Sequence, residues 1–135
     1  MPPTPLARVR SLCRALPGAH EVEAWGEPTF RIKNKIFAMY ASAGNHHGQG
    51  RPSLWCMATP ENQELLVRSR PERFFVPPYV GPSGWIGIYL DRRPAWTEVR
   101  ELLQDALVLR SSRSKRRAAP RSPPSTPRRT RPGTR

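Results

Sequence analysis

The sequence contains no run of 18 or more apolar residues and has only two cysteines among its 135 residues. The first absence excludes a membrane-spanning helix. The N-terminal stretch MPPTPLARVRSL also lacks the apolar core of a signal peptide. Cys13 and Cys56 fall at positions predicted to be buried, which fits a reducing compartment, and no C-x-x-C metal spacing occurs. We therefore expect a cytoplasmic protein.

Acidic residues are absent from 110–135, which holds ten basic residues, five prolines and no aromatic residue. Residues 1–109 carry thirteen basic and ten acidic residues, a net charge of +3, so most of the total of +13 lies in the C-terminal segment. This segment cannot bury enough apolar surface to offset its chain entropy. We predict a folded domain over 1–109 and a disordered Arg- and Pro-rich tail over 110–135.

A tail of this composition has two interpretations. It binds phosphate backbones without reading sequence, or it is a solvated extension without a role. If all ten charges met phosphates, log K would fall with log salt at a slope of roughly −7 to −9.

Helix caps and apolar spacing divide the domain into helices and strands. Helices begin after Thr4-Pro5 and Thr59-Pro60, where a hydroxyl cap precedes a proline at the first helical position. A third helix spans about 96–109, with apolar residues at helical spacing. HEVEAW is an irregular first strand, and further strands are predicted within 29–40, 53–58 and 85–90. The predicted fold class is α+β, an antiparallel sheet with helices on one face.

The segment TFRIKNKIFAMY, residues 29–40, is predicted to form a hairpin. With Asn34-Lys35 as a two-residue turn, Ile32 lies opposite Phe37 and Phe30 opposite Met39. All four then face the helices, and a shift by one residue would exchange the two faces.

The same alternation predicts an open outer face that carries Arg31 and several aromatic side chains. One interpretation is a platform on which bases or the side chains of a partner stack. The other is cross-strand aromatic pairing that stabilises the sheet, partly covered by residues 77–84 or by the tail. The predicted aromatic residues of this face are Tyr40, Trp55, Trp85 and Tyr89.

The hairpin tip, with its lysines on either side of Asn34, forms a small basic projection suited to phosphate contacts. Charged tips are also common because turns are solvated, so the tip alone does not identify a binding site. The predicted DNA-binding residues are Arg31, Lys33, Lys35, Arg113, Lys115, Arg116, Arg117, Arg128 and Arg129.

Catalytic and metal-binding patterns are weak in this sequence. His46-His47 lies in a glycine-rich loop without a nearby third ligand. GPSGWIG lacks the Lys-Ser/Thr that a phosphate-gripping loop needs. We predict no catalytic residue, no metal site and no cofactor, and an enzyme would need a ligand pocket near His20, Trp25 and Tyr79.

Three segments carry a family resemblance: LCRALPGAHEVEAWGEPTFRIKNKIFAMY, PPYVGPSGWIGIYLD and WTEVRELLQDALVL. Their landmarks are a leucine-rich first helix ending in Leu16-Pro17-Gly18, a Trp-Gly-x-Pro-x-Phe-x-Val/Ile-x-x-Lys-x-Phe-Ala block over 25–38, and the stretch from Pro78 to Ile86. In combination these motifs are quite specific. Over roughly residues 5–109 the chain resembles the MmcQ/YjbR family.

The resemblance implies a CyaY-like α+β fold and a bacterial cytoplasmic protein that binds DNA through a double-wing motif. It makes Arg31, Lys33 and Lys35 wing candidates, because Lys35 falls on the family's glycine-glycine-lysine turn. The chain departs from the family at IKNK, which replaces the usual glycines, and at DALVL, which stands where many members have Ser-Tyr. The basic tail has no counterpart in the family pattern.

The implied fold also resembles frataxins, whose iron chemistry uses an acidic ridge on the first helix. Here the first helix carries three arginines and no acidic residue, which argues against iron. The leading hypothesis is a small DNA-binding protein with little base readout that uses the hairpin and the tail. The alternative is a non-enzymatic protein-interaction module that binds through the aromatic face, and an enzyme is the third possibility.

Overall fold

The computed structural model describes residues 3–45 and 50–118 of the chain. Its six strands form one sheet in the order β1-β2-β3-β4-β6-β5, and every neighbouring pair is antiparallel. The predicted α+β class is confirmed. The elements are α1 (Pro5–Arg14), β1 (Ala19–Ala24), β2 (Glu27–Ile32), β3 (Lys35–Ala41), β4 (Ser53–Cys56), α2 (Pro60–Ser69), β5 (Phe74–Phe75), η1 (Gly81–Ser83), β6 (Ile86–Tyr89) and α3 (Trp96–Ala118).

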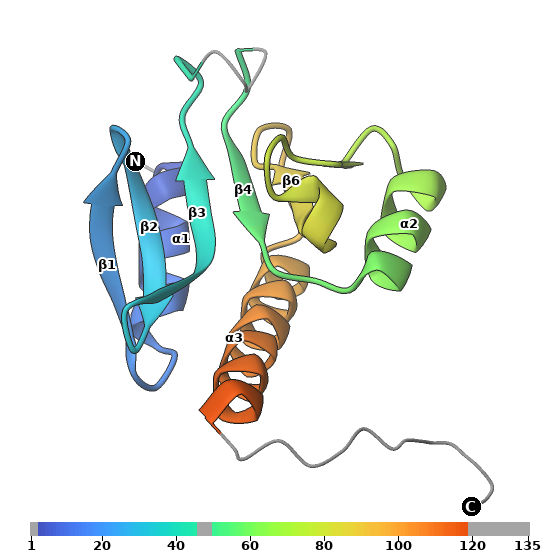
Figure 1. The fold of residues 1–135 in the computed structure, drawn as a ribbon. Coiled ribbons are helices and arrows are strands. Elements are labelled where there is room, and N and C mark those ends of the chain that lie inside the picture. The colour runs from blue at the N-terminus through green and yellow to red at the C-terminus, as the bar shows by residue number, and fades with distance from the viewer. Residues whose placement is uncertain (1–2, 46–49, 119–135) are drawn as a thin grey trace, which may run out of the picture.

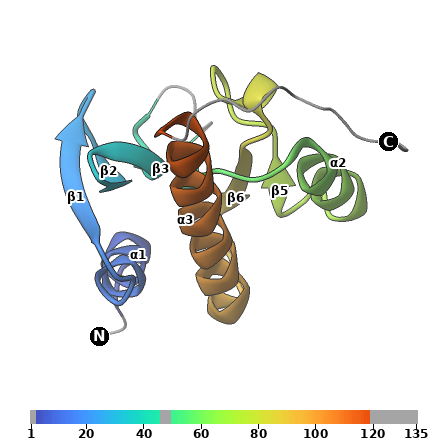
Figure 2. The same cartoon turned by 60° about the horizontal axis from the view of Figure 1, so that its bottom comes forward.

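Helices α1 and α3 cover one face of the sheet, and the core lies between them and the strands (Figures 1 and 2). α3 contacts β2, β3 and β4, whereas α1 contacts β1 and α3. The fully buried side chains Val9, Phe30, Leu54 and Leu103 come from both layers, so helices and sheet share one core. The hydroxyl caps form as predicted, because Thr4 accepts from Ala7 N–H and Thr59 from Asn62 N–H.

Helix α2 lies beside β5 at the edge of the sheet (Figure 2). It buries no residue fully, and Leu65 is exposed. The side-chain amide of Gln63 instead fixes the helix by donating to the carbonyls of Gly81 and Trp85. After α2, Phe74–Phe75 forms β5 and pairs with β6.

Two tight turns join β1, β2 and β3. Trp25 and Gly26 connect β1 to β2, and all of Trp25, Gly26, Lys33 and Asn34 have positive φ. Positive φ at both central residues is typical of the hairpin turn that matches strand twist. The predicted turn at Asn34-Lys35 is therefore wrong by one residue, because Ile32 pairs directly with Lys35 across Lys33-Asn34.

A β-bulge in the β2–β3 hairpin changes which residues face the helices. Arg31 pairs with Ile36 but Phe30 pairs with Ala38, so β3 has one residue more than β2 in between. Phe37 and Ala38 are consequently both fully buried, although neighbours in a regular strand point to opposite faces. Beyond the bulge the predicted alternation is reversed.

Helix α3 is longer than predicted. It continues past Leu109 to Ala118, because Arg, Lys and Ala are good helix formers and the next proline is Pro120. Residues 119–135, the rest of the predicted tail, lie outside the described residues. Among the helices of residues 3–45 and 50–118, none has the length and apolar character needed to span a membrane.

Candidate functional site

The hairpin tip carries two exposed lysines. Lys33 sits in the turn and Lys35 begins β3, and no carboxylate of the described residues pairs with either. Arg31 differs from them, because it is half-buried and its Nε donates to Thr29 Oγ1 at 3.1 Å. The structure thus places Lys33 and Lys35 together at the tip and holds Arg31 against the strand.

The C-terminal part of α3 lies at the same end of the molecule as this tip (Figure 1). Arg110 connects the two, since its Nε donates to the carbonyl of Ile36 at 3.0 Å. The predicted contact residues Arg113, Lys115, Arg116 and Arg117 fall within α3, whereas Arg128 and Arg129 lie outside the described residues. We call the tip and this part of α3 the basic end.

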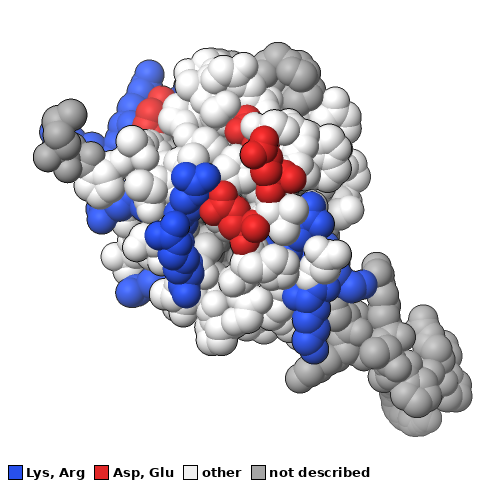
Figure 3. Space-filling model, turned by 90° about the vertical axis from the view of Figure 1, so that its left-hand side faces the viewer, with Lys and Arg blue, Asp and Glu red and all other residues white. Residues whose placement is uncertain are grey.

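Basic side chains elsewhere on the domain are more often neutralised. Figure 3 shows acidic groups beside basic ones on the face that carries β1 and α1, rather than one continuous positive surface. Ion pairs hold four arginines next to carboxylates: Arg10–Glu21, Arg51–Asp91, Arg68–Glu64 and Arg70–Glu98. Carboxylates therefore offset part of the positive charge on the sides of the fold.

The predicted open aromatic face is wrong in two respects. Tyr40 pairs with Leu54 and lies with it on the helix-covered face, because the bulge reversed the alternation. Trp55 and Trp85 do lie on the other face, but they are only 4% and 5% exposed. Tyr89 is half-buried and its ring stacks on Phe75 with centroids 4.6 Å apart.

A cavity of about 630 Å³ occupies this second face of the sheet. Its walls are mainly apolar and come from β3, β4, the β1–β2 turn and the segment that follows β5. Met39 pairs with Trp55 across the strands, so the two side chains line it together. The other lining residues are Trp25, Glu27, Ile36, Asn45, Pro78, Tyr79, Val80, Trp85 and Arg110.

Trp25 and Tyr79 line this cavity with rings that are both 78% exposed. They come from different elements, yet each has a positive φ, 55° for Trp25 and 67° for Tyr79. Positive φ is uncommon for a bulky aromatic residue. Both exposed rings therefore stand on left-handed backbone and outside the core.

Glu27 is a buried carboxylate, 7% exposed, at the cavity wall. Its Oε2 accepts three hydrogen bonds of 2.9 Å each, from Ser42 N, Ser42 Oγ and Asn45 Nδ2. This network fixes the start of β2 to the segment after β3. The sequence pattern did not identify this network. Glu27 follows a turn and continues the series of Glu21 and Glu23, which are both exposed, so it looked like a third surface glutamate.

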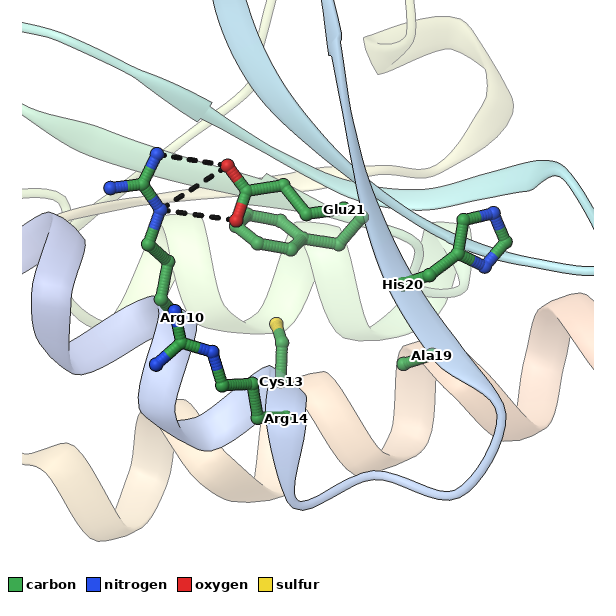
Figure 4. Close-up of a pocket in the computed structure, with 7 residues that line it drawn as sticks. Arg10, Cys13, Arg14, Ala19, His20 and Glu21 are labelled. Carbon is green, nitrogen blue, oxygen red and sulfur yellow. Dashed lines mark hydrogen bonds and ion pairs between the residues drawn. The ribbon is translucent and has the colours of Figure 1, made fainter.

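A second, smaller pocket of about 280 Å³ lies between α1 and β1 (Figure 4). Arg10 binds Glu21 across it with Nη2–Oε2 at 2.9 Å, and the His20 ring points away from that pair. Burial raises the pKa of the Cys13 thiol to about 12, so the thiol stays protonated at neutral pH. The predicted enzyme pocket near His20, Trp25 and Tyr79 is thus divided, since His20 borders this pocket and the two exposed rings border the larger one.

Metal ligands do not gather in the part of the chain that the structure describes, where no three His, Cys, Asp or Glu side chains come together. His46 and His47, the pair considered above, lie outside the described residues.

Comparisons with known proteins agree with this architecture. A structure of Deinococcus radiodurans protein DR2400, whose domain is classed as DUF419, superposes with a TM-score of 0.67 and covers 85% of this chain and 89% of its own. The two sequences are 20% identical, so this likeness shows the fold. No curated protein matches the chain significantly. A family model described as YjbR matches residues 14–108, and the chain therefore belongs to the YjbR family.

Proposed function

We propose that this protein binds duplex DNA through its basic end, with contacts mainly to phosphates. The observation that carries the proposal is the position of the exposed Lys33 and Lys35 beside the basic C-terminal part of α3. Lysines at a projecting turn reach a phosphate backbone without steric obstruction. A cluster of positive charge at one end also raises the rate of association with a polyanion.

Little sequence readout is expected from this surface. A lysine ammonium is a point charge that contacts phosphates without distinguishing bases, whereas bidentate base recognition is typical of arginine. Arg31, the arginine of the β2–β3 hairpin, has its Nε bound to Thr29. The aromatic platform that was the alternative is not supported, because Trp55 and Trp85 are buried.

The test is a titration of random-sequence duplex at several salt concentrations with two charge-matched double variants. Lys33→Gln/Lys35→Gln removes two charges from the tip. Arg92→Gln/Arg93→Gln removes two exposed charges that precede α3. The second pair lies about 20 Å from Arg110 along the helix, which is beyond the roughly 10 Å over which salt leaves charges unscreened.

We expect the lysine variant to lower the slope of log K against log salt by about 2, since each lost phosphate contact changes it by about 1. The arginine variant should keep nearly the wild-type slope. Equal effects of the two variants would place the contact elsewhere. Absence of binding at low salt, or binding that ignores salt, would refute DNA binding by phosphate contact.

A further inference from the structure

We propose that the 630 Å³ cavity is a binding site for a small aromatic anion, such as an aromatic carboxylate. The proposal does not depend on DNA binding, because apart from Arg110, which reaches the cavity from α3, the residues that carry it lie on the sheet face opposite α1 and α3. It rests on three features of the cavity: its apolar wall, its two exposed rings and its one cationic side chain.

The wall offers a mainly apolar surface. Trp55 and Trp85 are almost fully buried, and Met39 packs beside Trp55. The indole Nε1 of Trp55 donates to Ser53 Oγ at 3.1 Å, so it presents no unsatisfied donor to a ligand. A volume in this range, with mostly apolar and aromatic walls and few polar groups, is typical of small-molecule sites.

The two exposed rings indicate that the ligand is aromatic. The φ values of Trp25 and Tyr79 belong to the left-handed region, which favours glycine or asparagine and costs other residues about 1–2 kcal/mol. Turn geometry does not call for an aromatic side chain at either position, and neither ring is buried. Rings placed in this way border the cavity from two different elements, where they can stack on a planar ligand.

Charge along the cavity indicates that the ligand is an anion. Arg110 is the one cationic side chain among the described lining residues, and its bond to the Ile36 carbonyl fixes it at the start of β3. Glu27 lies toward the far end of that strand, about 15 Å away by the strand rise. The negative charge of Glu27 is solvated at Oε2 by three hydrogen-bond donors and lies away from Arg110, so the positive end of the cavity is the Arg110 end.

The experiment uses two probes with the same ring system and different charge. They are 8-anilino-1-naphthalenesulfonate, an anion, and the uncharged N-phenyl-1-naphthylamine. Three of the four tryptophans line the cavity, so energy transfer from tryptophan to a bound probe reports binding there. Titrations of the full chain give the affinity and the stoichiometry for each probe.

The arginine variant tests the charge. Arg110→Gln should lower the affinity for the anionic probe about tenfold, because one charge-assisted hydrogen bond is lost. The affinity for the uncharged probe should change less than twofold. Arg100→Gln removes the same charge from an exposed position of α3 and should change neither. Equal affinities of the two variants for the anion would overturn the role of Arg110.

The ring variants test the site even if Arg110→Gln fails to fold. Trp25→Gly and Tyr79→Gly remove exposed rings at positions where the backbone favours glycine, so both variants should remain folded. Each variant should bind both probes with several-fold lower affinity. Wild-type affinity of both ring variants for both probes, a stoichiometry far above one, or no probe binding to the wild type would each overturn the proposal.

Discussion

The buried carboxylate of Glu27 and its hydrogen-bond network can be tested with a single substitution. Glu27→Ala removes a carboxylate that is 7% exposed and accepts three hydrogen bonds at Oε2. Hydrogen bonds to a charged acceptor contribute about 1.5–3 kcal/mol each, and the plain sum would be about 4.5–9 kcal/mol. Ser42 and Asn45 are half-buried and can bond water in the variant. We therefore expect a loss of about 2–4 kcal/mol in the free energy of unfolding.

The assay is equilibrium unfolding in urea, followed by circular dichroism. Glu27→Gln keeps an acceptor oxygen without the charge and should lose about half as much, because neutral hydrogen bonds are roughly half as strong. Glu23→Ala removes an exposed glutamate from β1 and should change the stability by less than about 0.5 kcal/mol.

Hydrogen exchange gives an independent measurement at one atom. The Ser42 amide is protected by its bond to Glu27 Oε2 at 2.9 Å, so its exchange should accelerate in Glu27→Ala and not in Glu23→Ala. A loss below 1 kcal/mol together with unchanged Ser42 protection would refute the buried carboxylate network.

Two further predictions concern pH and packing. The Arg51 guanidinium lowers the pKa of Asp91, so the stability from this pair is present above the unfolded pKa of about 3.9 and is lost as pH falls through the folded pKa. The free energy of unfolding of the wild type should exceed that of Asp91→Asn by about 1 kcal/mol at pH 7, since both side chains of the pair are partly exposed. Thermal unfolding should show this difference shrink as pH falls below about 3.9, and a constant difference would contradict the assignment. Gly87→Ala should cost about 1–3 kcal/mol in urea unfolding, because its Cβ would collide with the Phe75 ring, and an unchanged midpoint would mean that the ring lies elsewhere.

The features predicted well from the sequence are those set by local chemistry. Thr4-Pro5 and Thr59-Pro60 cap their helices because a hydroxyl and a proline act within one turn. Periodicity likewise identified the apolar stripe of α3. Its end was misplaced because the stripe stops at Leu109 while helix-forming residues continue.

The features predicted poorly depend on contacts between distant residues. The bulge in β3 is chosen by how Phe37 and Ala38 pack under the helices, which no alternation pattern encodes. Trp55 and Trp85 were placed on the correct face, but the alternation left open whether residues 77–84 cover them. The structure buries both, and Pro78, Tyr79 and Val80 line the same cavity. Arg110 looked like the first residue of a tail, and only the fold brings it to Ile36 and the cavity.

The strand order has a consequence for how copies of this protein meet. β1 and β5 form the two borders of the sheet, where unpaired backbone groups invite strand addition from another chain. β5 is only two residues long, and β1 carries the exposed charged residues Glu21 and Glu23. Both borders therefore discourage edge-to-edge aggregation, and crowded copies should stay apart.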